Sequence, residues 1–247
     1  MNESQDGIVN LNKPRGITSA KALYRVRKIT GVRKSGHGGT LDPGADGVLL
    51  LCLGRATKLV ERIMDQPKVY LADFRLDVTS ATLDADSEME PVACSARPTR
   101  AALLDCLRSF EGRIEQTPPA VSAVKIGGRP AYKLARRGET PKLRPRAVHV
   151  YWIHLRQYDW PIARIEMACG RGTYVRSLAR DVGAALGVGG CVTSLTRLAI
   201  GPFDLRSAWS MDDLARAASW RDALIPLERA RTLLTRDSAA PSRPRAS

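Results

Sequence analysis

The sequence predicts an α+β fold with a largely antiparallel, mixed sheet flanked by helices and loops. Segments with strand and helix patterns are mixed along the chain without a strict βαβ alternation. The segments 148–157 and 162–169 flank the turn Tyr-Asp-Trp-Pro, a pattern typical of an antiparallel hairpin. With 247 residues, of which 44% are hydrophobic, the chain can bury a substantial core.

The first elements carry clear start and stop signals. Residues 7–11 are predicted to form a strand, and Thr18 or Ser19 can cap a helix that ends at Gly31. The apolar run 48–53, bounded by glycines, indicates a strand that is buried on both faces. By the same signals, further strands are expected at 69–76 and 113–117. Further helices are expected from Thr99, closed by Gly112, at 131–137, at 175–186, after Ser210 and at 224–234. We expect one catalytic domain over residues 1–235 and a disordered tail over 236–247.

The positive charge is concentrated in two segments. The net charge is +14, and residues 13–34 contain eight basic residues and no acidic one. Residues 125–146 contain eight more, against Glu139 alone, so the rest of the chain is close to neutral. Two dense basic segments on a neutral body favour a polyanion-binding surface, although an arginine-rich composition would also raise the charge.

Composition argues against several other classes of protein. No apolar run approaches the ~20 residues of a membrane-spanning helix, and the polar start predicts no secretory signal. The five cysteines form no Cys-x-x-Cys pair, so we expect no metal site and no disulfide framework. We therefore expect small buried thiols in a cytoplasmic protein.

Residues 36–47, Gly-His-Gly-Gly-Thr-Leu-Asp-Pro-Gly-Ala-Asp-Gly, are the densest candidate site. Glycines on both sides of His37 and Asp42 allow a ligand to approach the backbone closely. Pro43 fixes its own φ and favours an extended Asp42, so the carboxylate would be held on a stiff turn. By itself, however, Asp-Pro-Gly is equally a good structural turn.

This segment resembles the signature of the TruB family of pseudouridine synthases, in which Gly-His, Leu-Asp-Pro and Gly-Val/Met-Leu follow in this order. Other segments resemble the family at fitting spacings, and the resemblance covers roughly residues 7–235. They are NLNKPRGITS, KVY ending at Tyr70, QTPPAVSAVKIGGRPAYKLARRGE, CGRGTYVRSLARDVGAALG and SLTRLAIGPF. The family resemblance implies the pseudouridine-synthase fold and action on the T-loop uridine of tRNA, position 55.

The resemblance also implies roles for residues at the catalytic centre. Asp42 would be the essential carboxylate, and Tyr70 would stack on the flipped uracil and handle a proton late in the reaction. Arg176 would pair with Asp42 and keep it ionised, and Asp84 would hold Arg176 from its other side. The reaction breaks an N–C glycosidic bond and rejoins it through carbon without net redox change, so we expect no cofactor.

The remaining implied roles concern the RNA. Tyr174 and Leu195 would line the base pocket, and His37 would occupy the place that the flipped nucleotide vacates. Lys13, Lys125 and Arg136 are candidates for phosphate contacts, although each could equally be a solvated surface residue.

The sequence departs from the family pattern in two places. Ser80-Ala81-Thr82 stands where Thr-Asp-Thr is usual, which leaves the hydrogen bonding around Asp84 open. Many family members also carry a C-terminal RNA-binding domain, often PUA-like, which we do not expect in the short segment after residue 235. We expect a monomer that binds the T-stem-loop of tRNA. The alternatives are a tRNA-binding and refolding factor, or a synthase that acts on another RNA.

Overall fold

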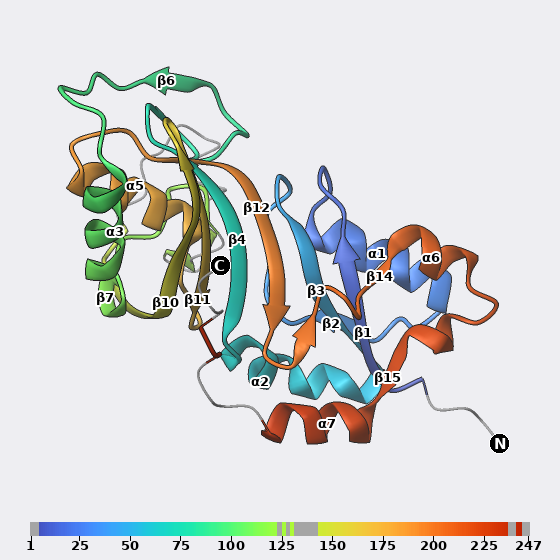
Figure 1. Ribbon diagram of the computed structural model, residues 1–247. Helices are drawn as coiled ribbons and strands as arrows, with labels where there is room; N and C mark the ends of the chain where they lie inside the picture. The colour runs from blue at the N-terminus through green and yellow to red at the C-terminus, as the bar shows by residue number, and fades with distance from the viewer. Residues whose placement is uncertain (1–4, 123–124, 127–128, 131–142, 237–240, 244–247) are drawn as a thin grey trace. The chain divides into compact units, whose positions relative to one another are not determined.

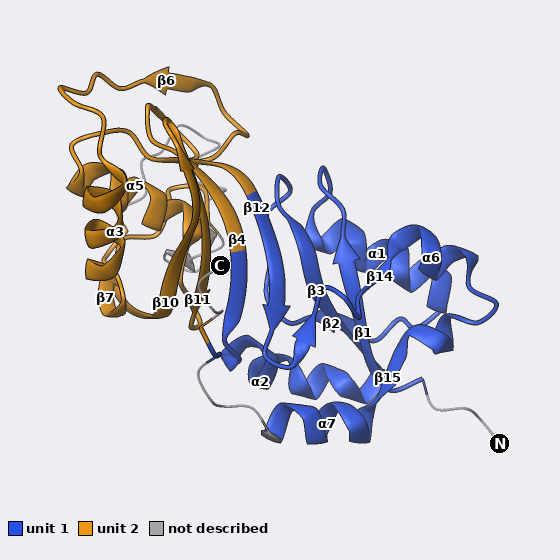
Figure 2. Ribbon diagram, viewed as in Figure 1, with its two compact units in different colours: residues 1–70, 195–242 blue, residues 71–194, 243–247 orange. Residues whose placement is uncertain are grey.

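The computed structural model describes residues 5–122, 125–126, 129–130, 143–236 and 241–243. These residues form two compact units (Figure 2): unit 1 takes residues 1–70 and 195–242, and unit 2 takes residues 71–194 and 243–247. The strands β4 and β12 each contribute residues to both units. We predicted one catalytic domain over 1–235; whether the two units act as one stays a prediction.

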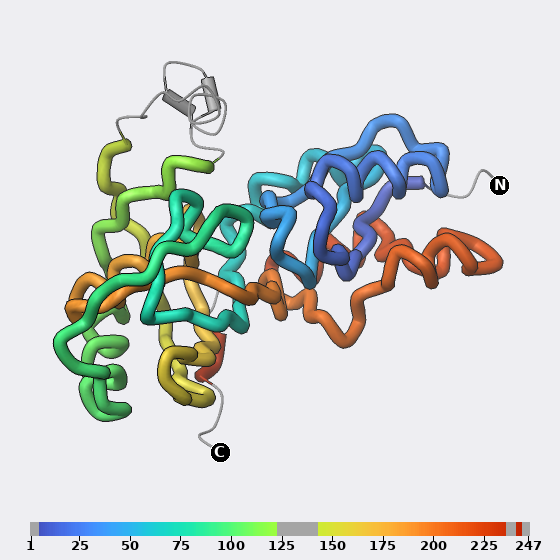
Figure 3. The backbone as a smooth tube through the Cα atoms, turned by 90° about the horizontal axis from the view of Figure 1, so that it is seen from above, coloured from blue at the N-terminus to red at the C-terminus, as the bar shows by residue number. Residues whose placement is uncertain are grey.

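The sheet of unit 1 is built around the antiparallel pair β1 and β3, which pair from Gly7 opposite Leu53 to Lys13 opposite Gly47. The N-terminal and C-terminal parts of this unit lie side by side (Figure 3), because β15 pairs antiparallel with β1 and β14 pairs parallel with it. The strands of unit 1 are β1 (Gly7–Lys13), β2 (Ser35–His37), β3 (Asp46–Leu53), β12 (Cys191–Ile200), β13 (Phe203–Asp204), β14 (Trp209–Ser210) and β15 (Leu224–Pro226).

Strand β3 is buried on both faces, as its apolar run predicted. Val48, Leu50 and Cys52 pack into one hydrophobic cluster, and the alternating residues Leu49 and Leu51 pack into another. Helices cover both faces of this sheet (Figure 1). One cluster contains residues of η1 (Gly54–Leu59), α2 (Val60–Asp65) and α7 (Leu227–Arg236), and the other contains residues of α1 (Ser19–Thr30), α6 (Met211–Arg216) and η2 (Trp220–Ala223).

Helix α1 has the caps that the sequence predicted. The Thr18 hydroxyl accepts a hydrogen bond from the Lys21 backbone N–H, and Gly31 ends the helix at φ 71°, a left-handed conformation that favours glycine. The equivalent caps are present at Thr99 and Ser210. Local capping chemistry therefore determines where these helices begin.

Unit 2 contains a sheet in the order β4-β11-β10-β7, with α3 against β10 (Figure 1). Its main elements are β4 (Lys68–Arg75), α3 (Arg100–Ser109), β7 (Gly112–Gln116), β10 (Arg146–Asp159), β11 (Ile162–Cys169) and α5 (Val175–Ala185). Its short strands are β5 (Val78–Ser80), β6 (Met89–Pro91), β8 (Lys125–Ile126) and β9 (Arg129–Pro130). The antiparallel pairing of β10 with β11 confirms the predicted hairpin.

The α+β class and the largely antiparallel sheet are confirmed, with two corrections to the predicted elements. Residues 224–226, expected to begin the last helix, form β15, because they pair with Gly7–Val9 of β1. Gly112 begins β7 instead of closing α3, whose C-cap is Phe110. The predicted helix at 131–137 and most of the predicted disordered tail lie outside the described residues.

Candidate active site

In unit 1, Asp42 lies in the loop between β2 and β3. Hydrogen bonds from Ser19 and Gly16 fix the backbone of its two neighbours, Leu41 and Pro43. The Ser19 hydroxyl, at the start of α1, donates to the Leu41 carbonyl and accepts from the Leu41 N–H, both at 2.9 Å. The Gly16 N–H donates to the Pro43 carbonyl at 2.9 Å. Leu41 is buried, whereas Asp42 is only half-buried. These hydrogen bonds anchor the backbone on both sides of the half-buried Asp42.

Arg197 of β12 fastens the same loop from within the core. The residue is 1% exposed, and its guanidinium donates to the carbonyls of Val48, Thr40 and Gly39 at 2.7, 3.2 and 3.3 Å. Gly47 has φ 102°, and a Cβ there would lie 2.3 Å from the Arg197 carbonyl oxygen. Only glycine allows β3 to approach β12 this closely. The backbone on both sides of Asp42 is thus tied to one buried cation.

Lys13 lies inside the fold and not on its surface, which corrects its expected role as a phosphate contact. The residue is 0% exposed, and its ammonium donates to the carbonyls of Pro14 and Ile17, both at 2.9 Å. Burial lowers the pKa of Lys13 to about 8, and the nearby carboxylates of Asp46 and Asp42 oppose that shift. The buried ammonium fixes the backbone at Pro14 and Ile17 and is not accessible to an RNA phosphate.

His37 ends β2 and is half-buried. Its Nδ1 has no hydrogen-bond partner within the described part of the chain. Burial, and then the charge of Arg197, lower the His37 pKa, while a backbone contact with Gly39 opposes them. The lowered pKa favours the neutral imidazole over the charged one. Its predicted contact with RNA stays a prediction.

Tyr70 and Leu195 are the remaining site residues of unit 1. Tyr70 lies in β4 and is half-buried, whereas Leu195 lies in β12 and is 9% exposed. Their expected roles at the base pocket are not tested by these positions and stay predictions.

In unit 2, Arg176 lies in the first turn of α5, where the helix dipole disfavours a cation. The Asp84 carboxylate compensates, because its Oδ2 lies 3.2 Å from Nη1 of Arg176. The guanidinium also donates to the carbonyls of Thr82 at 2.8 Å and Val121 at 3.0 Å, and the residue is 5% exposed. The expected contact between Asp84 and Arg176 is present; its role in catalysis, and the pairing of Arg176 with Asp42, stay predictions.

The hydrogen bonding around Asp84 is complete despite the departure from the family pattern. The Thr82 hydroxyl donates to Asp84 Oδ1 at 2.5 Å, and the Asp86 N–H donates to the same oxygen at 3.0 Å. The Ser80 hydroxyl donates to the Asp84 carbonyl at 2.7 Å. Ser80 and Thr82 therefore hold the segment that carries this carboxylate.

Helix α5 also holds the segment that follows β7. The Tyr174 N–H donates to Oε1 of Gln116 at 2.7 Å, and Ser177 and Arg180 both donate to the Thr117 carbonyl, at 2.8 and 3.0 Å. Tyr174 is the N-cap residue and is half-buried. Three parts of the sequence that lie far apart thus meet around the start of α5.

Two predicted phosphate contacts cannot be placed. Arg136 lies outside the described residues, and the structure describes only the backbone of Lys125, in β8. Conversely, Arg197 and Gln116 had no predicted role, although both lie in segments that resemble the family motifs. An arginine in a strand with no other charged residue was the available signal for Arg197.

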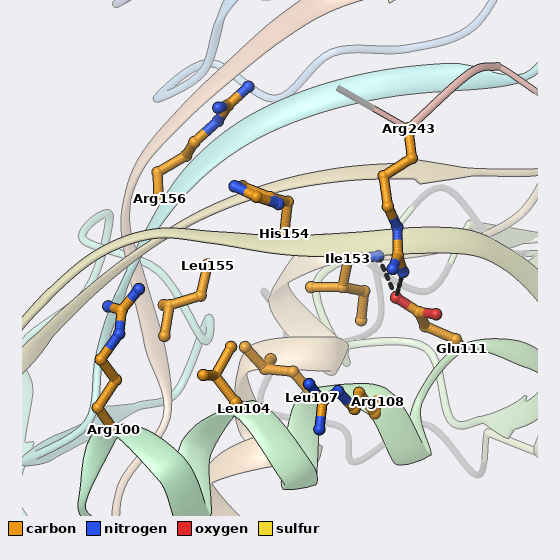
Figure 4. Close-up of a pocket in the computed structure, with 10 residues that line it drawn as sticks. All are labelled: Arg100, Leu104, Leu107, Arg108, Glu111, Ile153, His154, Leu155, Arg156 and Arg243. Atoms are coloured by element: carbon orange, nitrogen blue, oxygen red, sulfur yellow. Dashed lines mark hydrogen bonds and ion pairs between the residues drawn. The ribbon is translucent and has the colours of Figure 1, made fainter. Parts of the chain in front are cut away.

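A separate pocket of about 280 Å³ lies between α3 and β10 in unit 2 (Figure 4). Its rim is arginine-rich, but the protein itself compensates most of this charge. Arg243 pairs with Glu111, Arg156 with Glu166, and Arg108 with Asp105. We assign no function to this pocket.

Neither metal nor disulfide chemistry is indicated by the described side chains. No group of three or more His, Cys, Asp or Glu residues gathers among them as a metal site would require. All five cysteines are free thiols; Cys52, Cys169 and Cys191 are buried, whereas Cys94 and Cys106 are partly exposed. Within the described ranges, no helix is long and apolar enough to cross a membrane.

Two family models together match residues 27–234 of the chain. The N-terminal domain of TruB family pseudouridylate synthase matches residues 27–175, and the C-terminal domain of tRNA pseudouridylate synthase B matches residues 176–234. The chain belongs to the TruB family. The boundary between the two TruB models falls within the first turn of α5, between Val175 and Arg176, and differs from the boundary between the two compact units.

Curated TruB relatives support the same placement. The tRNA pseudouridine synthase B of Symbiobacterium thermophilum is 43% identical over 213 residues, which cover 85% of this chain and 71% of the relative. The protein of the same name from Stutzerimonas stutzeri is 44% identical over 85% of this chain and 68% of its own length.

Among solved structures, this TruB chain is similar to one in the crystal structure of a Cbf5-Nop10-Gar1 complex, with a TM-score of 0.73 and 30% identity over 92% of this chain. A second match is to a structure of an H/ACA RNP bound to a substrate RNA containing 2'-deoxyuridine, with a TM-score of 0.70 and 27% identity. The chain spans 61% of the length of either match. The predicted pseudouridine-synthase fold is thereby confirmed.

Proposed function

We propose that this protein converts uridine to pseudouridine in the T-loop of tRNA, at position 55, and that Asp42 is its catalytic carboxylate. The reaction detaches uracil from the ribose at nitrogen and reattaches it through carbon, without net oxidation or reduction. It therefore requires a positioned acid or base and a way to hold the detached base, but no redox cofactor.

The observation that carries the proposal is the attachment of the Asp42 loop to the fold. Arg197, Ser19 and Gly16 hold the backbone on both sides of this half-buried carboxylate. A catalytic group gains most when its position is fixed before the substrate arrives, because no ordering is then required in the transition state. A surface Asp-Pro-Gly turn without function would need no such support.

In this proposal Arg176 is the electrostatic partner of Asp42 in the RNA-bound enzyme. An arginine charge next to a carboxylate keeps it ionised, as a nucleophile or base must be. Asp84 and the carbonyls of Thr82 and Val121 support the role, because they fix the guanidinium in one orientation.

The target uridine must leave its stack before it can react. Flipping a nucleotide costs a few kcal/mol, and stacking on Tyr70 would return about 1–3 kcal/mol of that. Tyr174 and Leu195 would complete the base pocket, and His37 would fill the space that the nucleotide leaves. We expect the enzyme to act as a monomer in the cytoplasm.

The test is to incubate the purified protein with an unmodified tRNA transcript and then to map pseudouridine at single-nucleotide resolution. We expect modification at the T-loop uridine alone. Modification at other uridines only would contradict the T-loop assignment and favour a synthase acting on another RNA. An unmodified transcript would contradict the proposed activity itself.

A further inference from the structure

The outer face of α1 carries four side chains, Lys21, Tyr24, Arg25 and Lys28, which we call the α1 stripe. At 100° per residue they fall within about a third of the helix circumference. All four are exposed. Tyr24 is 55% exposed and is the one exposed large hydrophobic side chain in the part of the chain that the structure describes. The ring belongs to neither hydrophobic cluster of unit 1, so packing does not explain its presence.

The charge of the stripe is not neutralised within the protein. The sequence has no acidic residue between Asp6 and Asp42. Lys21, Arg25 and Lys28 form no ion pair with any acidic side chain that the structure describes. Other basic residues of the same segment have internal partners: Arg15 pairs with Asp46 at 2.9 Å. The structure thus separates the basic residues that serve the fold from those that face outward.

Tyr24 adds an aromatic surface to this charge. The Lys28 ammonium lies 5.0 Å from the centroid of its ring, a cation–π contact that orients both side chains. Basic residues next to an exposed aromatic ring are the combination that binds single-stranded or unstacked nucleic acid, because the cations contact phosphates and the ring stacks on a base.

The stripe is rigidly connected to the candidate catalytic loop. At the first turn of α1, Ser19 forms two hydrogen bonds with Leu41, the residue before Asp42. In the last turn, Arg27 donates from Nε to the Ser35 hydroxyl at 2.6 Å and from Nη2 to the Ser35 carbonyl at 2.8 Å, and Ser35 begins the strand of His37. A ligand on the stripe is therefore held at a fixed position relative to Asp42 and His37.

We infer that the α1 stripe is a contact surface for the RNA substrate, in which Lys21, Arg25 and Lys28 bind backbone phosphates and Tyr24 stacks on an exposed base. This inference rests on the proposed function, because it takes the ligand to be the tRNA that Asp42 modifies. It assigns to the α1 stripe of unit 1 RNA contacts that the catalytic residues do not make.

The first test removes the charge. We compare the triple variant Lys21→Gln/Arg25→Gln/Lys28→Gln with wild type by measuring Kd for an unmodified tRNA transcript from 50 to 300 mM salt. The slope of log Kd against log salt should become shallower by about 2 to 3, since each lost phosphate contact removes about 0.7–0.9. The matched control is Lys58→Gln/Arg62→Gln/Arg229→Gln, which removes three exposed charges elsewhere in unit 1.

The second test removes the ring. Tyr24→Ala should weaken tRNA binding by about 5- to 150-fold, the range measured when a stacking aromatic residue is lost, whereas Tyr24→Phe should bind as wild type. In single-turnover and steady-state assays the defect should appear in KM, with kcat at saturating tRNA unchanged, because the stripe does not touch the reacting atoms.

Failure of this inference can be distinguished from failure of the proposed function. If wild type forms pseudouridine but the stripe triple loses no more affinity and no more salt dependence than the control triple, the inference is overturned. Equal binding by Tyr24→Ala and wild type would overturn the stacking assignment. If wild type forms no pseudouridine, the proposed function fails, while the Kd comparison still decides whether the stripe binds tRNA.

Discussion

The Asp42 loop of unit 1 and the Arg176 cluster of unit 2 differ in how the sequence supplies them. Asp42 and its flanking glycines come from one stretch of twelve residues, 36–47. Arg176 lies at the start of α5, and the groups that fix it come from two other segments, at Thr82–Asp84 and at Val121. The first site is visible as a motif, whereas the second exists only when distant segments meet.

The two regions also balance charge differently. The buried Arg197 under the Asp42 loop is satisfied by three backbone carbonyls and leaves the carboxylate half-exposed. Arg176 is satisfied by two carbonyls and by the Asp84 carboxylate. Arg197, bound to carbonyls, orders the backbone that supplies them, whereas Arg176, bound to a carboxylate, is itself held in one orientation. We infer that Arg197 fixes the backbone that carries the Asp42 carboxylate in unit 1, whereas in unit 2 Asp84 fixes the orientation of the Arg176 guanidinium.

The largest expected effect comes from removing the presented carboxylate. Asp42→Asn should lower pseudouridine formation by at least about 10²- to 10⁴-fold, the contribution typical of a positioned acid or base, because the amide can neither attack nor accept a proton. The measurement is a single-turnover assay on a tRNA transcript.

Binding of the same transcript serves as its control and should be retained by Asp42→Asn. If cells that carry this variant keep full tRNA function while Tyr24→Ala or the stripe triple impairs it, the protein's main role is tRNA binding and refolding.

Replacing Arg197, the buried cation that binds the Asp42 loop, should lower the stability of the fold more than any other substitution proposed. Arg197→Met leaves three buried carbonyls without their donors, so we expect the free energy of unfolding to fall by about 3–5 kcal/mol in urea denaturation. Arg231→Met, which breaks an exposed pair with Glu228, should change it by less than about 1 kcal/mol. Equal effects of the two substitutions would show that the loop does not depend on Arg197.

Asp84→Asn tests whether the Asp84 carboxylate orients the Arg176 guanidinium in unit 2. The amide keeps an acceptor for the Asp86 N–H but loses the charge opposite Arg176, so stability should fall by about 1–3 kcal/mol and turnover should fall with it. Asp105→Asn, at the exposed pair with Arg108 in α3, is the control and should change stability by under about 1 kcal/mol. Lower stability with unchanged turnover would limit Arg176 to a structural role.

The last expected effect is a pH dependence caused by Lys13, which changes stability only at alkaline pH. Because its pKa is lowered from 10.5 to about 8 in the folded protein, the unfolded chain binds more protons between these values. The free energy of unfolding should therefore rise with pH from about 8 to 10.5, by roughly 1 kcal/mol per pH unit. Below pH 8 the folded protein bears the full cost of burying the charged ammonium.

Lys13→Met isolates that contribution, since other titrating groups remain the same in both proteins. The difference in unfolding free energy between wild type and the variant should grow in favour of wild type as the pH rises. A constant difference across this window would show that the Lys13 pKa is not lowered.

Much of the fold follows from local signals. The caps at Thr18, Thr99 and Ser210 and the doubly buried run of β3 were readable because each depends on residues close in sequence. The start of the last helix was misplaced because β15 forms only by pairing with β1, over 200 residues away in sequence. Lys13 was assigned to the surface because its charge, and not its burial, is visible in the sequence.

The sequence by itself determined the family, the elements with local caps, and Asp42 as the candidate carboxylate, since a contiguous motif fixes its own turn geometry. Only the tertiary structure decided what supports that residue and which cations face outward without an acidic partner. Burial and partnership depend on residues distant in sequence: Arg197 reaches Gly39 and Thr40, Arg15 reaches Asp46, and the α1 stripe faces outward. A count of positive charges is encoded locally, but their division between core and surface is a property of the folded chain.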